Sequence, residues 1–299
     1  MKKLLGLFLM MASVGGCAPV GDEATGQAGQ FTVTDTESYA AQGTWDGDEF
    51  VNTVRSTFSP PGHGYGGTQG ICGLTRVRGF FADKHSWARI VIDGGYYATQ
   101  TAQGAASTRP VGAQDVYAQM GCEAIATFTG TGIGTASTDL VTTRSSSTFS
   151  TSMDVDSNTT GRICPWYGVR GAFSQLAVGG TEGAPISEVA YSSGVSETHA
   201  RGVDGRDAVV SDSQCTKWSG DPAWTYAFSS TRGTLAGALT YTSYKASEYF
   251  CYLEGVSRGS QQSGNIDVQV QHAVHSGVDY YFTASSGTSG HWNCVQHAL

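Results

Sequence analysis

A short motif that begins with a cysteine occurs three times in the chain, and this recurrence constrains the fold more than any other feature. Cys72 and Cys164 each begin the pattern Cys-x4-Val-Arg-Gly-x-Phe, and Cys251 begins Cys-x4-Val with Arg-Gly one residue later. An aromatic residue between two hydroxyl residues precedes each motif, at Phe58, Phe149 and Tyr241. The motif cysteines are 92 and 87 residues apart, and these aromatic residues are 91 and 92 apart. Two landmarks with one period predict three tandem repeats, in residues 44–132, 133–220 and 221–299.

A second cysteine follows each motif, which predicts one disulfide inside each repeat. The chain has 7 cysteines, and the six other than Cys17 allow about 15 pairings in principle. The repeat selects the pairs Cys72–Cys122, Cys164–Cys215 and Cys251–Cys294, which are 50, 51 and 43 residues apart. Closing a loop of about 50 residues stabilises a fold by roughly 4 kcal/mol in the chain-entropy model. Such a crosslink matters for a unit of about 80 to 90 residues, because a unit of that size buries a modest core.

The motif itself predicts a β-strand with a one-residue bulge. In each copy the cysteine shares a strand face with the residue two positions later, because side chains alternate with period two. Those residues are Leu74, Trp166 and Leu253. The valine five positions after the cysteine breaks this alternation, and a bulge would return it to the same face. Gly168 and Gly255 stand where a bulge is easy, whereas Arg76 holds that position in the first copy and requires another backbone geometry.

Further strands follow each motif, and the predicted fold class is all-β. A strand over Ala88–Ile92 precedes the turn residues Asp93-Gly94-Gly95, and apolar residues alternate with polar ones over Ile266–Val274 before a turn at Ser276-Gly277. Only residues 114–120 are compatible with one or two helical turns. We therefore predict three tandem sandwich-like repeats of about 80 to 90 residues, each with one internal disulfide. We expect the units to fold independently, although a closed pseudo-threefold body is also compatible with the sequence.

The N-terminus has the features of a secretory signal. Lys2 and Lys3 precede an apolar run of about 11 residues, which is shorter than the roughly 20 residues that span a bilayer. The sequence Val14-Gly15-Gly16-Cys17 resembles the lipobox of bacterial lipoprotein signals. That resemblance implies that residues 1–16 are removed and that Cys17 carries the lipid, including palmitate, which tethers the protein to a membrane. The residue after the cysteine is not aspartate, which favours the outer membrane or cell surface of a bacterium.

Composition narrows the possible partners. Residues 17–43 are small and polar and are predicted to be a flexible linker. The formal net charge is -8 and no basic run occurs, which argues against nucleic acid as a partner. The pattern Cys-x-Leu-x-x-Val-x-Gly loosely resembles repeats of uncharacterised secreted bacterial proteins. This resemblance implies a secreted β module and no particular activity.

The sequence offers little sign of catalysis or of a metal site. Four histidines lie near the C-terminus, at His272, His275, His291 and His297. The first two are three residues apart in an alternating strand, so we expect them on opposite faces and expect no metal. The segment Asp154–Asn158 begins like a calcium loop but lacks the later glycine and glutamate. No Gly-x-Ser-x-Gly, His-Glu-x-x-His or phosphate loop is present, so we expect neither catalytic residues nor a cofactor.

Tryptophans near turns are the candidate ligand-binding residues. They are Trp87, Trp218, Trp224 and Trp292. Aromatic rings beside polar side chains can form a platform for sugars, although packing beneath loops is the more common role of such residues. The sequence thus predicts a membrane-tethered, surface-displayed and non-catalytic binding or adhesive lipoprotein, with polysaccharide or a surface protein as ligand. The alternative is an exported hydrolase whose catalytic residues are dispersed along the chain.

Overall fold

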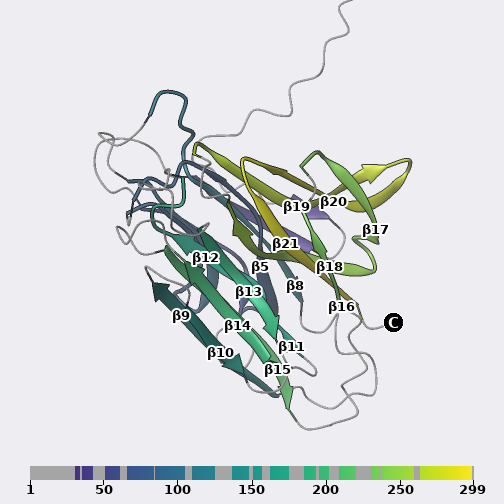
Figure 1. Ribbon diagram of the computed structural model, residues 1–299. Helices are drawn as coiled ribbons and strands as arrows, with labels where there is room; N and C mark the ends of the chain where they lie inside the picture. The colour runs from purple at the N-terminus through teal and green to yellow at the C-terminus, as the bar shows by residue number, and fades with distance from the viewer. Residues whose placement is uncertain are drawn as a thin grey trace, which may run out of the picture.

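The described part of the chain is built from β-strands and turns and contains no helix, which confirms the all-β prediction (Figure 1). The computed structural model describes residues 31–33, 36–42, 51–60, 66–83, 85–104, 110–124, 137–147, 151–156, 162–174, 185–192, 195–201, 209–219, 230–235, 237–258 and 263–297. Cys17 and residues 1–16 lie outside the described residues, so signal cleavage and lipidation stay predictions.

The strands follow one another through the chain in short steps. They are β1 (Phe31–Val33), β2 (Thr36–Gln42), β3 (Val51–Arg55), β4 (Phe58–Ser59), β5 (Thr68–Gly79), β6 (Trp87–Asp93), β7 (Tyr96–Ala102), β8 (Tyr117–Ala124), β9 (Ser137–Ser147), β10 (Thr151–Asp156), β11 (Arg162–Ile163), β12 (Trp166–Arg170), β13 (Ile186–Ser192), β14 (Val195–Arg201), β15 (Val209–Ser219), β16 (Ser230–Thr234), β17 (Thr240–Lys245), β18 (Tyr249–Ser257), β19 (Ile266–His275), β20 (Val278–Ser286) and β21 (Ser289–Gln296).

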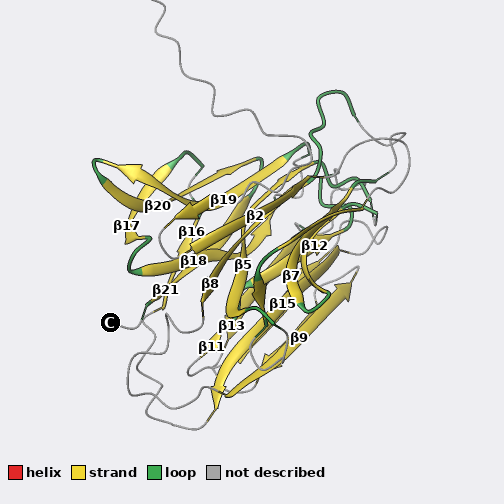
Figure 2. Ribbon diagram, turned by 180° about the vertical axis from the view of Figure 1, so that it is seen from behind, coloured by secondary structure: helices red, strands yellow, loops and turns green. Residues whose placement is uncertain are grey.

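These strands form three sheets, which we name by their strand number. The eight-stranded sheet has the order β1-β2-β8-β5-β19-β20-β17, with β4 beside β5. The six-stranded sheet has the order β10-β14-β13-β18-β21-β16, and the seven-stranded sheet has the order β11-β15-β12-β6-β7-β3, with β9 beside β15. Figure 2 shows the strands of these sheets from behind, with loops only at their ends.

Each sheet joins strands from two of the three predicted repeats. The motif strands β5, β12 and β18 pair with β19, β6 and β13, which are the first strands of hairpins from a different repeat. Strands of different sheets also pack on one another within each predicted repeat, for example β7 on β8, β14 on β15 and β18 on β19. The expectation of independent units is therefore wrong, because every unit supplies a hairpin that completes the sheet of another unit.

All three motif strands contain the predicted bulge. The register between paired strands shifts between Leu74 and Arg76, between Trp166 and Gly168, and between Leu253 and Gly255. The valines that follow, Val77, Val169 and Val256, are at most 1% exposed. The bulge thus returns the valine to the buried face in all three copies, including the first, where arginine replaces glycine.

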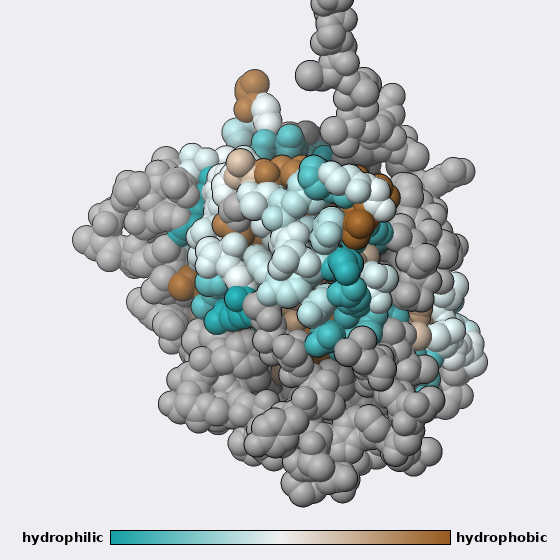
Figure 3. Space-filling model, turned by 90° about the vertical axis from the view of Figure 1, so that its right-hand side faces the viewer, coloured by the Kyte–Doolittle hydropathy of each residue, from teal (hydrophilic) through white to brown (hydrophobic). Residues whose placement is uncertain are grey.

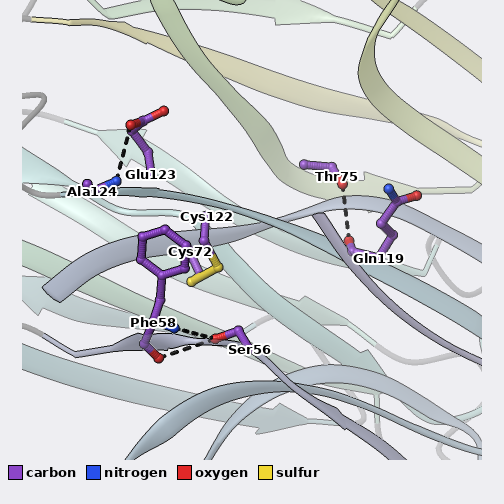
Figure 4. Close-up of a disulfide and its surroundings, with 8 residues drawn as sticks. All are labelled: Ser56, Phe58, Cys72, Thr75, Gln119, Cys122, Glu123 and Ala124. Carbon is purple, nitrogen blue, oxygen red and sulfur yellow. Dashed lines mark hydrogen bonds between the residues drawn. A yellow bond between two sulfur atoms is a disulfide. The ribbon is translucent and has the colours of Figure 1, made fainter. Parts of the chain in front are cut away.

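Two of the predicted disulfides are present between directly opposed residues. Cys72 lies opposite Cys122 and is bonded to it (Figure 4), and Cys251 is bonded in the same way to Cys294. Cys164 is also disulfide-bonded. The side chain of its predicted partner lies outside the described residues, so that pairing stays a prediction.

The three copies of the motif approach one another closely at the residue that follows each motif cysteine. A Cβ atom added to Gly73 would lie 2.7 Å from the Cβ of Tyr252 and 2.9 Å from the Cβ of Pro165. These three residues directly follow the three motif cysteines. Glycine at position 73 is therefore required by the close approach of the other two strands.

Three expectations about local structure can be compared with the strands. The turns at Gly94–Gly95 and Ser276–Gly277 have positive φ at all four residues, as tight hairpin turns require. Residues 114–120 form no helix and instead lead into β8. The predicted linker boundary at residue 43 is wrong, because β2 (Thr36–Gln42) pairs along its whole length with β8.

Candidate ligand-binding face

One face of the eight-stranded sheet carries a continuous set of polar and aromatic side chains that are all at least partly exposed. We call it the outer face and define it by residues that lie opposite one another in β8, β5, β19, β20 and β17. They are Tyr117, Gln119, Arg76, Arg78, Asp267, Gln269, Gln271, His275, Tyr280, Phe282, Ala284 and Tyr241. The intervening residues, such as Val77, Val268 and Val270, are fully buried. Strict alternation therefore separates a core face from a solvated face.

An arginine and an aspartate join the two halves of this face across β5 and β19. The guanidinium of Arg76 donates to both carboxylate oxygens of Asp267, at 3.1 and 2.8 Å. The guanidinium groups of Arg76 and Arg78 lie 5.6 and 4.9 Å from the centre of the Tyr117 ring. Bidentate pairing and cation–π contact hold these side chains in one geometry. Asp267 thus balances the charge of Arg76, while Arg78, directly opposite Asp267 in the register, adds a second positive charge to this end of the face.

Glutamine amides form the next part of the outer face. The hydroxyl of Tyr117 donates to Oε1 of Gln119 at 3.1 Å, and Nε2 of Gln271 donates to the same oxygen. Gln271 lies on β19 and Gln119 on β8, so their amides meet above the bulge of β5. Thr75, the bulged residue, fixes the backbone there by donating to the carbonyl oxygen of Gln119 at 3.3 Å. The result is a fixed row of amide and phenol groups.

Aromatic rings end the row at the edge strand β17. The ring of Tyr241 stacks on that of His275, with centroids 4.3 Å apart and planes 26° apart. Phe282 contacts Tyr241 edge-on at 5.8 Å and lies directly opposite Gln271 on β19. Tyr241 is 37% exposed. Figure 3 views the molecule from the side where β17 lies in Figure 1, and there pale residues surround small teal and brown patches.

The six-stranded sheet carries a different cluster around Gly255, which occupies the same position after the bulge as Arg76 does in the eight-stranded sheet. Gly255 lies between Glu188 on β13 and His291 on β21, and a Cβ at Gly255 would come within 2.3 Å of the Glu188 backbone. Because that position has no side chain, Nε2 of His291 reaches to 3.6 Å from Oε2 of Glu188. Burial lowers the pKa of His291, the charge of Arg232 lowers it further, and Glu188 opposes the shift.

A buried carboxylate completes this second cluster. Glu254, the bulged residue of β18, is fully buried, and its Oε2 lies 2.6 Å from Nε of Arg232. Nδ2 of Asn293 donates to its other oxygen at 2.8 Å. Arg232 also donates to the carbonyl oxygen of Val189 at 3.1 Å. These contacts satisfy a carboxylate that burial would otherwise strongly destabilise.

Two further histidines, His272 and His297, are each packed against a single carboxylate. Nδ1 of His272 lies 3.0 Å from Asp279, and Nε2 of His297 lies 3.5 Å from Glu123. His272 and His275 point to opposite faces of β19, as predicted, because their opposed residues on β20 are the buried Tyr281 and the half-exposed Val278. Within the described ranges, no three histidine, cysteine or acidic side chains are arranged to hold a metal ion.

The predicted tryptophan platform is wrong for the two tryptophans whose side chains are described. Trp87 is 9% exposed and lies 5.1 and 5.9 Å from the guanidinium groups of Arg89 and Arg170. Trp292 is 8% exposed, and its Nε1 donates to the carbonyl oxygen of Thr234. Neither ring presents an open face for stacking on a ligand. Trp224 and the side chain of Trp218 lie outside the described residues, and so do the side chains of the Asp154–Asp156 segment.

Neither a protein-family model nor a curated protein sequence matches this chain. Among the described segments, none is a helix of the length and apolar character that would cross a membrane.

Most residues of the outer face were missed by sequence reasoning. The alternation of Asp267, Gln269 and Gln271 with buried aliphatic residues is visible in the sequence, and it marks them as one solvated row. The sequence does not show that this row lies beside Arg76, because β5 and β19 are about 190 residues apart and pair only in the folded chain. Tyr241 was noted as a repeat landmark, but its exposure at a sheet edge requires the tertiary structure.

Proposed function

We propose that this protein is a membrane-tethered, surface-displayed lipoprotein that binds a ligand on the outer face and has no catalytic activity. The observation that carries the proposal is the continuity of that face. Polar and aromatic side chains from five strands lie side by side, held by hydrogen bonds on β8, β5 and β19 and by ring contacts at β17 and β20. Preorganised polar groups of this kind lower the ordering cost of binding.

The proposed architecture is a ring of three repeats that exchange hairpins. Its support is the identical strand arrangement of the three seams and the bulge and cysteine that recur in each motif strand. In this arrangement the residue after the bulge can differ from one repeat to another, because the strand pairing is the same in each. The eight-stranded sheet has Arg76 there and the six-stranded sheet has Gly255, so one scaffold presents different chemistry on different faces.

The proposed anchor is the lipid on Cys17, and the proposed location is the outer membrane or cell surface of a bacterium. The support is the lipobox-like segment together with disulfides, which form in oxidising compartments. Cys17→Ser should shift the protein from the membrane fraction to the soluble fraction, or leave it as an uncleaved precursor. Cell fractionation with immunoblotting measures this. Unchanged membrane association of the variant would refute the lipid anchor.

Ligand binding by the outer face can be tested with a variant that obstructs it. Ala284 is half-buried in the middle of the face, so Ala284→Arg would place a long side chain over the neighbouring amides. Detergent-solubilised protein should bind members of an array of glycans and envelope proteins, and A284R should lose that binding. Thr53→Arg makes a similar change on an exposed position of the seven-stranded sheet and should bind normally. Equal binding by A284R would exclude the outer face.

The alternative function is an exported hydrolase, and the Glu188–His291 pair favours it. A half-buried histidine with a lowered pKa beside a carboxylate is a common general base. If hydrolysis of polysaccharide or peptide substrates is found, Glu188→Gln should abolish it without changing the melting temperature. Under our proposal the unaltered protein hydrolyses none of these substrates.

A further inference from the structure

We infer that the outer face binds an uncharged polysaccharide, laid across the strands with one sugar ring stacked at Tyr241. This inference rests on the proposed function and names the ligand class of the same face. It follows from the order of chemical groups along the row from β17 to β8.

Tyr241 is the residue on which a sugar ring would stack. Tyr241 is held from one side by His275 and from its edge by Phe282, yet it keeps 37% of its surface exposed. Its orientation is thus set by two rings before any ligand arrives. An aromatic ring held in this way offers a flat apolar surface, and the apolar face of a sugar ring complements it.

Amide and phenol groups lie beside that ring. Phe282 lies opposite Gln271, whose amide is bonded to Gln119, which in turn accepts from the hydroxyl of Tyr117. Amides and phenols both donate and accept hydrogen bonds, which matches the hydroxyl groups of a sugar chain. Strands lie about 4.8 Å apart, so the row from β17 to β8 extends for roughly 19 Å. A ligand that fills it is an extended chain several sugars long.

The charge of these groups also bears on the ligand class. The carboxylate of Asp267 closes on Arg76 through two hydrogen bonds, and the amide row between Tyr241 and Tyr117 contains no carboxylate. An anionic polymer would bind through the arginines at the β5 end of the face and in a salt-dependent way, so the effect of salt distinguishes it from an uncharged chain. The amides of Gln271 and Gln119 and the hydroxyl of Tyr117 carry no formal charge and both donate and accept hydrogen bonds, which matches an uncharged polyhydroxylated chain.

The experiment is affinity electrophoresis of the detergent-solubilised full-length protein in gels that contain hydroxyethylcellulose, xylan, galactomannan or polygalacturonate. We expect at least one neutral polysaccharide to retard the protein and polygalacturonate to have no effect. Tyr241→Ala should weaken the retardation about tenfold, which corresponds to loss of one aromatic contact. Tyr241→Phe should retain it. Ile92→Ala, which truncates a side chain 46% exposed on the seven-stranded sheet, should migrate as the unaltered protein does.

The outcomes separate this inference from the proposed function. Retardation by polygalacturonate alone, or by none of the neutral polysaccharides, overturns the inferred ligand class. Neutral retardation that Tyr241→Ala leaves unchanged overturns the stacking position. If A284R still loses binding on the glycan and protein array, the outer face remains the binding face with a different ligand. If the unaltered protein binds nothing on that array, the proposed function fails as well.

Discussion

The eight-stranded and six-stranded sheets have the same strand arrangement at their seams but opposite chemistry beside the bulge. In the eight-stranded sheet, Arg76 fills the position after the bulge and lies between Gln119 and Gln269. In the six-stranded sheet the position is Gly255, and His291 and Glu188 meet above it. The side chain after the bulge therefore distinguishes a face filled by an arginine from one where a histidine and a glutamate approach each other.

The bulged residue also differs between the two sheets: it is uncharged in the eight-stranded sheet and charged in the six-stranded sheet. Thr75 is a short side chain that bonds the backbone of the adjacent strand. Glu254 is a buried carboxylate that depends on Arg232 and Asn293. The six-stranded sheet thus holds its central charge in the buried layer, whereas the eight-stranded sheet carries its Arg76–Asp267 pair on the partly exposed face. Three predictions test this contrast.

The largest expected effect is on the buried ion pair. Glu254→Ala should lower the free energy of unfolding by about 3 kcal/mol or more, because it leaves Arg232 without its carboxylate beside a buried amide. Asp267→Ala breaks the half-exposed pair of the eight-stranded sheet and should cost about 1 kcal/mol or less. Urea unfolding of both variants measures the difference. Equal losses would mean that the two ion pairs have the same structural role.

The second prediction concerns the empty position beside the bulge. Gly255 has φ of 150°, and an added Cβ would lie 2.3 Å from the Cα and Cβ of Glu188. Gly255→Ala should therefore destabilise the protein by about 2 kcal/mol through backbone strain and displacement of β13. Gly237→Ala is the matched control, since an added Cβ there meets nothing within 4 Å. A Gly255→Ala variant as stable as this control would show that β13 moves away at little cost.

The smallest expected effect is a pH dependence of stability that comes from His291. Its pKa in the folded protein is lowered, chiefly by burial, so the unfolded chain binds the proton more readily. Stability should consequently fall as the pH drops through the ordinary histidine range of about 6.5. His291→Gln should reduce this acid sensitivity in thermal melts between pH 5 and 8. His275→Gln, which changes an exposed ring on the other sheet, serves as the control; an equal change in both variants would contradict the assignment to His291.

Local features of the fold were accessible from the sequence because they depend on neighbours along the chain. Alternation over Ile266–Val274 predicts one buried and one solvated face, and steric limits on φ place the turn at Ser276–Gly277. The bulge was predictable because Leu253 and Val256 are three residues apart, and regular alternation would place these two apolar side chains on opposite faces of the strand. The disulfides Cys72–Cys122 and Cys251–Cys294 were predictable from the recurrent spacing of the cysteines. Each pair joins directly opposed residues on adjacent strands.

Only the tertiary structure decided which unit completes which sheet, and that decided the site. The pairing of β5 with β19 brings Asp267 to Arg76, and the pairing of β13 with β18 brings Glu188 to His291. Each seam pairs strands that are far apart in the sequence, and short-range alternation carries no information about which distant strands pair. The same limit explains the tryptophans, since burial of Trp87 and Trp292 depends on neighbouring strands. The sequence by itself determined strands, turns and crosslinks, whereas pairing between distant strands determined which side chains meet on the outer face.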